Sequence, residues 1–187
     1  MKKRELKIFK KIPTLETDRL VLKAISLNDL HDVYEYASDP TTSKYLLWMP
    51  HKNINDTKDY LKYIELLYSK GKFYDWGIHL KSNDKMIGTV GFTTLDHIMN
   101  SGSVGYVLNT KYTGKGFASE ALKTVINFGF SVLKLERLEA RFIIENKASQ
   151  RVLEKCGFIY GGIEREKMLV KGKYKNIGFS YKLITNA

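Results

Sequence analysis

A strand that leads through a glycine-containing turn into a helix occupies the middle of the chain. Residues 104–108 form an apolar run typical of a strand, and residues 117–133 place apolar side chains at helical spacing. Gly114 and Gly116 lie where the strand gives way to the helix. Glycine tolerates positive φ angles, and the first N–H groups of a helix have no intrahelical partner. The segment therefore predicts an anion site, with phosphate or pyrophosphate as the natural occupant.

The spacing of these glycines narrows the kind of phosphate site. A P-loop needs G-x-x-x-x-G-K-[ST], which is absent here. The dinucleotide fingerprint meets Ser119 at its third position. The acidic residue expected about 20 residues farther on has no clean match, since Glu136 and Glu139 fall before or early in the next strand. The spacing that fits is Lys111-x-x-Gly114-x-Gly116. A glycine turn that merely joins a strand to a helix is the structural alternative.

A second ordered block follows at residues 146–158, which read NKASQRVLEKCGF. Asn146 is a suitable N-cap for a short helix, and Gly157 is suited to end it. Val152 and Cys156 lie four residues apart on one apolar face of that helix, so a buried structural thiol is favoured over a nucleophile.

Two more blocks complete a pattern that covers most of the chain. Residues 14–23 read TLETDRLVLK, and residues 161–166 and 171–176 read GGIERE and KGKYKN. The four blocks resemble the GNAT superfamily of N-acetyltransferases, in the branch that includes the ribosomal-protein N-terminal (Rim-type) acetyltransferases. Lys111 stands where the family has Gln or Arg, and Asn176 where the branch has Asp.

The resemblance implies a fold. We expect a single GNAT-like domain of mixed α/β class at residues 14–184, after a basic N-terminal arm at residues 1–13. Its central mixed sheet would be strongly twisted and flanked by helices, in the order β-α-α-β-β-β-α-β-α-β-β. The sequence predicts strands at 19–24, 73–80, 85–94, 103–108, 137–144, 158–164 and 176–183, and helices at 26–37, 55–69, 117–133 and 148–156. In the family, the strands corresponding to 103–108 and 137–144 splay apart and hold coenzyme A between them.

The resemblance also implies acetyl-CoA as co-substrate. Backbone N–H groups of the loop would hold its pyrophosphate, and the strand before the loop would pair with the pantetheine arm and polarise the thioester carbonyl. The expected cofactor-binding residues are Tyr106, Val107, Leu108, Thr113, Gly114, Lys115, Gly116, Phe117, Ala118, Asn146 and Ser149.

The catalytic groups are less directly indicated. Leu153 replaces the tyrosine that many relatives use as general acid, so Ser149 is the expected substitute, with local bonding in its helix as the alternative role. Glu166 is the expected catalytic carboxylate, and Asp84 and Asp96 are alternatives. For each of the three carboxylates, a role as a surface or turn residue is the favoured alternative.

Tyr45 and Trp48, between the first two helices, are the expected acceptor-binding residues, because the family uses this region for acceptors. Core packing is their alternative role. The early helices carry no acidic cluster, and an α-amino group has a lower pKa than lysine, near 8. We therefore expect a protein N-terminal α-amine as acceptor, such as that of a ribosomal protein. An aminoglycoside or polyamine acceptor, and a sensor that binds acetyl-CoA without turnover, remain open alternatives.

The formal net charge of +11 raises a different class of function. Basic residues cluster in the first eleven residues and between 165 and 175. A non-catalytic ribosome- or RNA-binding protein would use such clusters. However, no RNA-binding aromatic motif accompanies them, so we favour solvated basic faces and no direct nucleic-acid role.

The remaining composition sets limits on environment. Cys156 is the only cysteine, which fits a reducing compartment. The sequence has no run of 18 apolar residues, so it predicts no membrane-spanning helix. The four histidines lack ligand spacing, so no metal is expected. We expect a cytoplasmic protein without a membrane partner, and the resemblance allows a homodimer.

Overall fold

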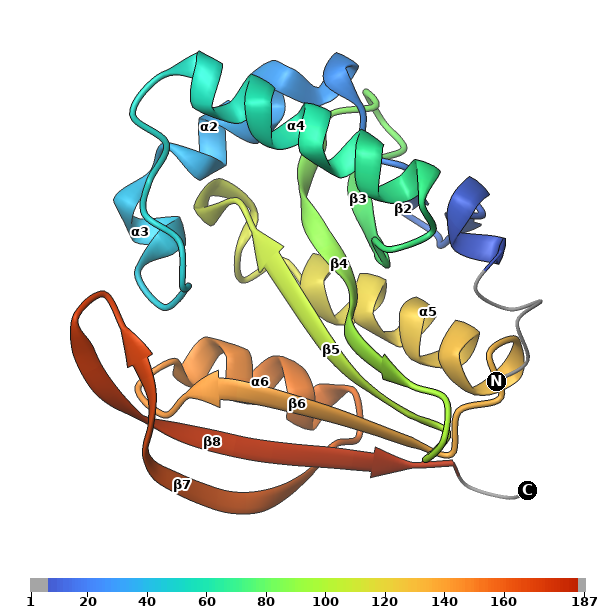
Figure 1. Cartoon of the computed structure of the whole chain (residues 1–187), viewed down its shortest axis with the longest axis vertical. Coiled ribbons are helices and arrows are strands. Elements are labelled where there is room, and N and C mark those ends of the chain that lie inside the picture. The colour runs from blue at the N-terminus through green and yellow to red at the C-terminus, as the bar shows by residue number, and fades with distance from the viewer. Residues whose placement is uncertain (1–6, 185–187) are drawn as a thin grey trace.

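An eight-stranded mixed sheet with helices on both faces forms the structure, a computed structural model that describes residues 7–184 (Figure 1). The strand order is β1-β2-β3-β4-β5-β6-β8-β7. The strands are β1 Leu15–Glu16, β2 Leu20–Lys23, β3 Asp75–Leu80, β4 Met86–Asp96, β5 Ser101–Leu108, β6 Arg137–Ile143, β7 Ile159–Val170 and β8 Lys173–Leu183. The α-helices are α2 Leu30–Ala37, α3 Pro40–Ser43, α4 Ile54–Ser69, α5 Phe117–Ser131 and α6 Lys147–Lys155, and the 3₁₀ helices are η1 Lys7–Lys11, η2 Leu27–Asp29 and η3 Thr110–Tyr112. The expected mixed α/β class is confirmed.

The two faces of β3 separate the helical layers. Trp76 is fully buried, and its ring meets that of Phe128 on α5 at 5.3 Å between centroids. Side chains alternate along a strand, so Asp75 and Gly77 face the other side, where α2 and α4 lie (Figure 1). None of the helices in the described range is long and apolar enough to cross a bilayer.

The second half of the expected N-terminal arm is part of the folded domain. Phe9 on η1 is fully buried and packs edge-on against Tyr74, Trp76 and Phe128. In the sequence, Phe9 lies among lysines, so the segment was expected to be a basic arm outside the domain. Residues 1–6 lie outside the described residues.

The sheet opens between β5 and β6. These two strands pair in parallel over only three residues, from Ser101 opposite Arg137 to Ser103 opposite Glu139. Beyond that point β5 continues along β4, whereas β6 continues along β8 as far as Ile143. The splay that the family resemblance implied is therefore present.

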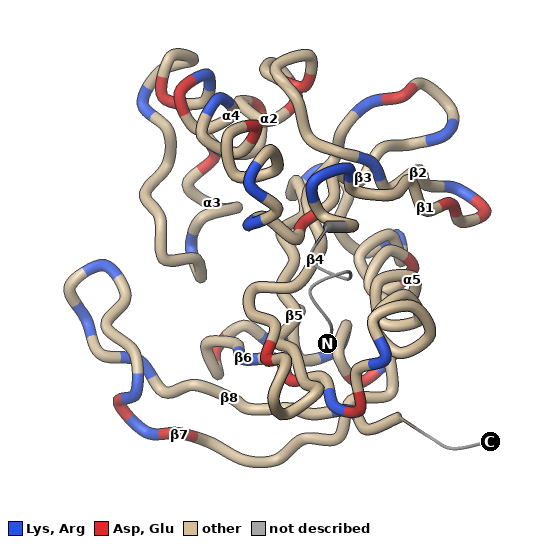
Figure 2. The backbone as a smooth tube through the Cα atoms, turned by 45° about the vertical axis from the view of Figure 1, so that its right-hand side comes forward, with Lys and Arg blue, Asp and Glu red and all other residues tan. Residues whose placement is uncertain are grey.

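The C-terminal hairpin is longer than its sequence indicated. β7 extends to Val170 through an irregular stretch in which Glu166 has a φ of 45°. The hairpin tip reaches α3 (Figure 1), where Lys171 Nζ donates to the carbonyl oxygen of Ser43 at 2.7 Å. Figure 2 shows basic residues at this tip, with others spread over most elements.

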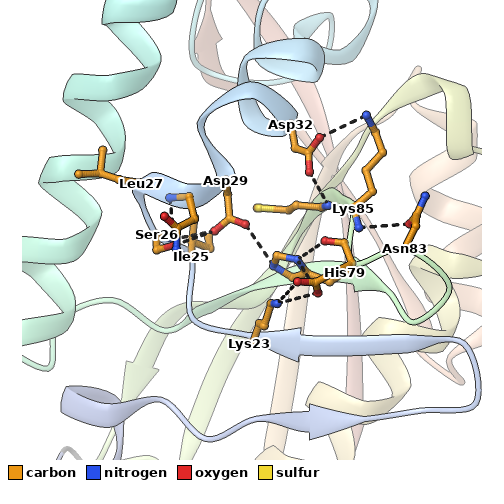
Figure 3. Close-up of polar contacts among 12 residues, drawn as sticks. Lys23, Ile25, Ser26, Leu27, Asp29, Asp32, His79, Asn83 and Lys85 are labelled. Carbon is orange, nitrogen blue, oxygen red and sulfur yellow. Dashed lines mark hydrogen bonds and ion pairs between the residues drawn. The ribbon is translucent and has the colours of Figure 1, made fainter.

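A polar cluster fixes α2 on the sheet (Figure 3). Asp32 accepts the backbone N–H of Met86 at 2.9 Å and pairs with Lys85 at 3.2 Å. Buried His79 lies 3.8 Å from Asp29 through Nε2, and its Nδ1 lies 3.1 Å from the carbonyl oxygen of Asp84. This anchoring sets the position of the aromatic residues farther along α2.

Candidate active site

A cavity of about 440 Å³ lies where β5 and β6 part. It contains most residues that the sequence indicated for the cofactor. Its walls are Thr41, Thr42, Tyr45, Leu46, Tyr106, Val107, Leu108, Thr110, Thr113, Gly114, Gly116, Phe117, Ala118, Ser119, Asn146, Ala148, Ser149, Arg151, Val152 and Lys155.

The glycine loop forms one end of this cavity. Gly114 and Gly116 have φ angles of 76° and 84°, which side-chain-bearing residues rarely adopt. A Cβ added to Gly114 would meet nothing within 4 Å, so the backbone there is open to a ligand. Gly116 caps α5 without any side-chain hydrogen bond. The first N–H groups of α5 are therefore left for an anion.

A basic pair of α6 adds positive charge to the cavity. Arg151 and Lys155 lie four residues apart on one face of the helix and line the wall. Sequence reasoning did not single them out, although their helical spacing next to Ser149 was a usable signal. Lys115 is absent from the wall, because its ammonium lies over the ring of Tyr112, 5.4 Å from the centroid. Lys111 pairs with Glu35 at 2.8 Å.

Two hydroxyl groups meet in the wall of the cavity. Tyr106 crosses from β5 to α6, and its Oη lies 2.8 Å from Ser149 Oγ and 2.9 Å from the Ser149 carbonyl oxygen. Burial raises the pKa of Tyr106, so its hydroxyl stays protonated over the physiological range. Asn146 caps α6 by accepting the N–H of Ser149 at 3.1 Å. Leu153, at the position of the family tyrosine, is buried.

A second cavity, of about 130 Å³, shares Val107 with the first. Half of the residues that line it carry aromatic rings: the lining is Val33, Tyr36, Ala37, Trp48, His51, Tyr60, Thr89 and Val107. The ring of His51 lies 5.8 Å from each of the Trp48 and Tyr60 rings. Burial lowers the pKa of His51, which favours the neutral imidazole.

This arrangement separates the residues that the sequence grouped at the site. Tyr45 lines the large cavity, while Trp48 lines the small one. Glu166 lies in neither wall and is exposed on β7, where its N–H donates to Asn176 Oδ1 at 3.0 Å. Cys156 is buried, and burial raises the pKa of its thiol to about 11.

The family model for the acetyltransferase (GNAT) domain matches residues 19–159. The chain belongs to the GNAT acetyltransferase family. It is therefore an acyltransferase, which agrees with the expectation from the sequence. Within residues 7–184, no group of three or more His, Cys, Asp or Glu side chains could hold a metal ion.

Similar proteins agree with this assignment. The chain is 35% identical to the uncharacterized N-acetyltransferase p20 of Bacillus licheniformis, over 86% of this chain and 90% of that protein. It superimposes with a TM-score of 0.82 on a putative ribosomal-protein-serine acetyltransferase from Vibrio cholerae, at 23% identity over 92% of this chain and 98% of the other. The TM-score is 0.75 for spermidine N-acetyltransferase from Vibrio cholerae in complex with CoA and spermine, at 19% identity over 89% and 96%. These two likenesses concern the fold.

Proposed function

We propose that this GNAT enzyme transfers the acetyl group of acetyl-CoA directly to a primary amine. One observation carries the proposal: two cavities meet at Val107 of β5. The larger cavity has the glycine loop at one end, and the smaller one is lined by aromatic rings. A thioester held beside Val107 would face both the cofactor side and an acceptor side.

The larger cavity has features that fit acetyl-CoA. The free N–H groups at the start of α5 suit the pyrophosphate, and the open backbone at Gly114 lets it approach closely. Arg151 and Lys155 suit further phosphate charge. Tyr106, Val107 and Leu108 lie on the part of β5 that has lost its β6 partner, so its backbone groups on that side can pair with the pantetheine amides.

The transfer needs few side chains. The nitrogen of a neutral amine bonds to the thioester carbonyl carbon, the carbon–sulfur bond breaks, and the sulfur takes a proton. An N–H near Val107 would stabilise charge on the carbonyl oxygen. The paired hydroxyls of Tyr106 and Ser149 are the proposed proton source for the sulfur. The proton lost by the amine passes to water.

The finer question is which amine accepts the acetyl group. A protein N-terminal α-amine, as on a ribosomal protein, stays a candidate because its pKa near 8 leaves a useful neutral fraction without a strong base. Contrary to the expectation of no acidic cluster in the early helices, α2 carries Asp32 and Glu35. Both are already paired with Lys85, which also favours the α-amine. The aromatic walls of the small cavity favour a second candidate, a small cationic amine.

A matched pair of glycine variants tests the cofactor site. Gly114 and Gly172 have nearly equal φ angles of 76° and 79°, and an added Cβ meets nothing within 4 Å at either position. Gly114→Glu and Gly172→Glu therefore carry similar backbone strain and the same charge. We expect acetyl-CoA to raise the melting temperature of wild type and Gly172→Glu, and not that of Gly114→Glu.

An amine panel completes the test of function. Release of free CoA thiol is followed with tripeptide amides and with alkyl polyamines as acceptors. Acetylation of at least one class supports the proposal. Binding of acetyl-CoA without transfer to any of them would reduce the role to that of a sensor.

A further inference from the structure

Asp75, at the start of β3, lies beside the small aromatic cavity. Its residue partner on β4 is Gly91, and the next β4 residue on the same face is Thr89, which lines the cavity. Gly105 lies directly across from Gly91 on β5. Both cross-strand neighbours are glycines, so neither places a side chain over the carboxylate, and the nearest side chain over Gly105 is the methyl group of Thr93 on β4.

The Asp75 carboxylate has no partner. Its backbone oxygen accepts the Tyr68 hydroxyl at 2.6 Å, but within residues 7–184 its side chain has neither a hydrogen bond nor an ion pair. The acids of η2 and α2 differ, because Asp29 caps its helix and Asp32 and Glu35 pair with lysines. Burial raises the pKa of Asp75 to about 7. A partly buried, unpaired carboxylate is costly, which is typical of a functional group awaiting a charged ligand.

The surroundings of Asp75 suit an organic cation. Tyr36 on α2 and Tyr60 on α4 line the cavity, and burial raises the pKa of both hydroxyls. The negative charge of Asp75 raises them further, so the carboxylate acts on both rings electrostatically. Trp48 completes a wall of rings whose faces attract an ammonium group. The neutral imidazole of His51 adds no competing charge.

The position of Asp75 relative to Val107 indicates the shape of the ligand. Asp75 lies across from Gly91 on β4 and Gly105 on β5, and Val107 is two residues farther along β5 than Gly105. For ordinary strand spacing this places the Cα atoms of Asp75 and Val107 about 12 Å apart. One amine cannot lie against Asp75 and attack a thioester at Val107. A ligand with two amino groups separated by a short alkyl chain can reach both.

We propose that Asp75 is the specificity-determining counter-charge for the second, non-reacting ammonium of a small diamine or polyamine acceptor. This inference rests on the proposed acetyl transfer. One amino group would reach Val107 as the nucleophile, while the aromatic rings enclose the alkyl chain. A tripeptide amide, which has one ammonium and neutral amides, would gain nothing from Asp75.

Two amines of equal length test the proposal. 1,4-Diaminobutane and 4-aminobutan-1-ol have the same chain length, and only the diamine carries a charge at its far end. At pH 8, where Asp75 is ionised, we expect wild type to show a kcat/KM about tenfold or more higher for the diamine. Asp75→Asn should lower this ratio by about tenfold or more, because the intrinsic difference between the two amines is the same for every variant. Asp59→Asn removes the same charge from an exposed position of α4 and should leave the ratio unchanged.

A binding measurement separates this inference from the proposed function. In the presence of CoA, the diamine should raise the melting temperature of wild type and Asp59→Asn more than the amino alcohol does, and Asp75→Asn should lose the difference. An unchanged ratio and an unchanged melting shift in Asp75→Asn would overturn the role of Asp75. If a tripeptide amide is acetylated equally by wild type and Asp75→Asn while the diamine is not preferred, the transferase function stands and this inference fails. If no amine is acetylated, the transferase proposal fails, and the melting shift alone decides whether Asp75 holds a diamine.

Discussion

Arg19 Nη2 lies 2.6 Å from Glu120 Oε2, and this ion pair ties the beginning of the sheet to the first turn of α5. The same guanidinium donates to the carbonyl oxygen of Lys115 at 3.1 Å and covers the ring of Phe117. Thr17 also donates to Glu120. The contacts converge on the segment that carries Gly116, so Arg19 holds the glycine loop in place from outside the cavity.

Removing this support should weaken cofactor binding more than it changes stability. Half of the Arg19 side chain is exposed, and exposed ion pairs contribute little to folding, about 0–1 kcal/mol. We expect Arg19→Ala to raise the KM for acetyl-CoA several-fold with a smaller change in kcat. Steady-state kinetics with varied acetyl-CoA checks this.

Lys81→Ala is the matched control, because Lys81 pairs with Glu16 at 2.9 Å on the same sheet without contacting the loop. Equal effects of the two variants on KM would mean that the Arg19 contacts do not organise the loop.

Much of the lining of the large cavity was predictable from the sequence because it is local. Gly114 and Gly116 lie within a few residues of the strand and helix that they join, so their spacing carries the geometry. Asn146 and Ser149 belong to one short helix with a recognisable cap. Contiguous motifs of this kind can be recognised without knowledge of tertiary packing.

The surroundings of the small cavity depend on packing between distant segments. Tyr36, Tyr60 and Asp75 come from two helices and a strand, and only the sheet brings them together. In the sequence, the tyrosines resemble ordinary residues of amphipathic helices, and nothing near Asp75 shows that it lacks a partner. Glu166 was predicted at the site but lines neither cavity. The motif around it gives no sign of where the C-terminal hairpin places this residue.

The hydroxyl pair should matter for turnover. Tyr106 Oη and Ser149 Oγ are 2.8 Å apart, so removing either one breaks the proposed route of the proton to sulfur. We expect Tyr106→Phe and Ser149→Ala each to lower kcat by about tenfold or more, with acetyl-CoA still raising the melting temperature. The double variant should be little worse than the worse single one, because the two groups act together.

Tyr181→Phe serves as the control for a tyrosine hydroxyl outside the cavity. Full kcat in both Tyr106→Phe and Ser149→Ala would remove these hydroxyls from the mechanism.

Replacing Glu35 by glutamine should lower the free energy of unfolding at neutral pH, and this effect should fade as the pH falls. Hydrogen bonds from Lys111, followed by Lys85, lower the pKa of Glu35 to about 2. A depressed carboxylate pKa stabilises the folded state above the unfolded pKa of about 4.5, and this stabilisation is lost as the pH falls toward 2. We expect Glu35→Gln to lower the free energy of unfolding by about 1–2 kcal/mol at pH 7, after allowance for solvent screening, and by much less at pH 3.

Urea unfolding at the two pH values measures this difference. Glu16→Gln, which alters a more exposed ion pair, should change little at either pH. A Glu35→Gln cost that does not depend on pH would point to lost packing instead of lost charge.

The contribution of Asp75 to stability should depend on pH in the opposite sense to that of Glu35. Burial raises its pKa from 3.8 to about 7, so the folded state prefers the protonated acid. The groups that face it from the helices are the hydroxyls of Tyr36, Tyr60 and Tyr68, which supply no positive charge. The cost of ionising Asp75 is absent below about pH 4, grows as the pH rises toward 7, and is complete above that value.

Asparagine has nearly the same shape and cannot ionise. Asp75→Asn should therefore match wild type in melting temperature at pH 4 and exceed it at pH 8, while Asp59→Asn follows wild type at both values. Addition of 1,4-diaminobutane and CoA at pH 8 should narrow the gap, because a bound ammonium compensates the buried charge of wild type. A variant that melts below wild type at pH 8 would show that the Asp75 carboxylate is already satisfied within the folded chain, and would leave no reason for it to seek a cation.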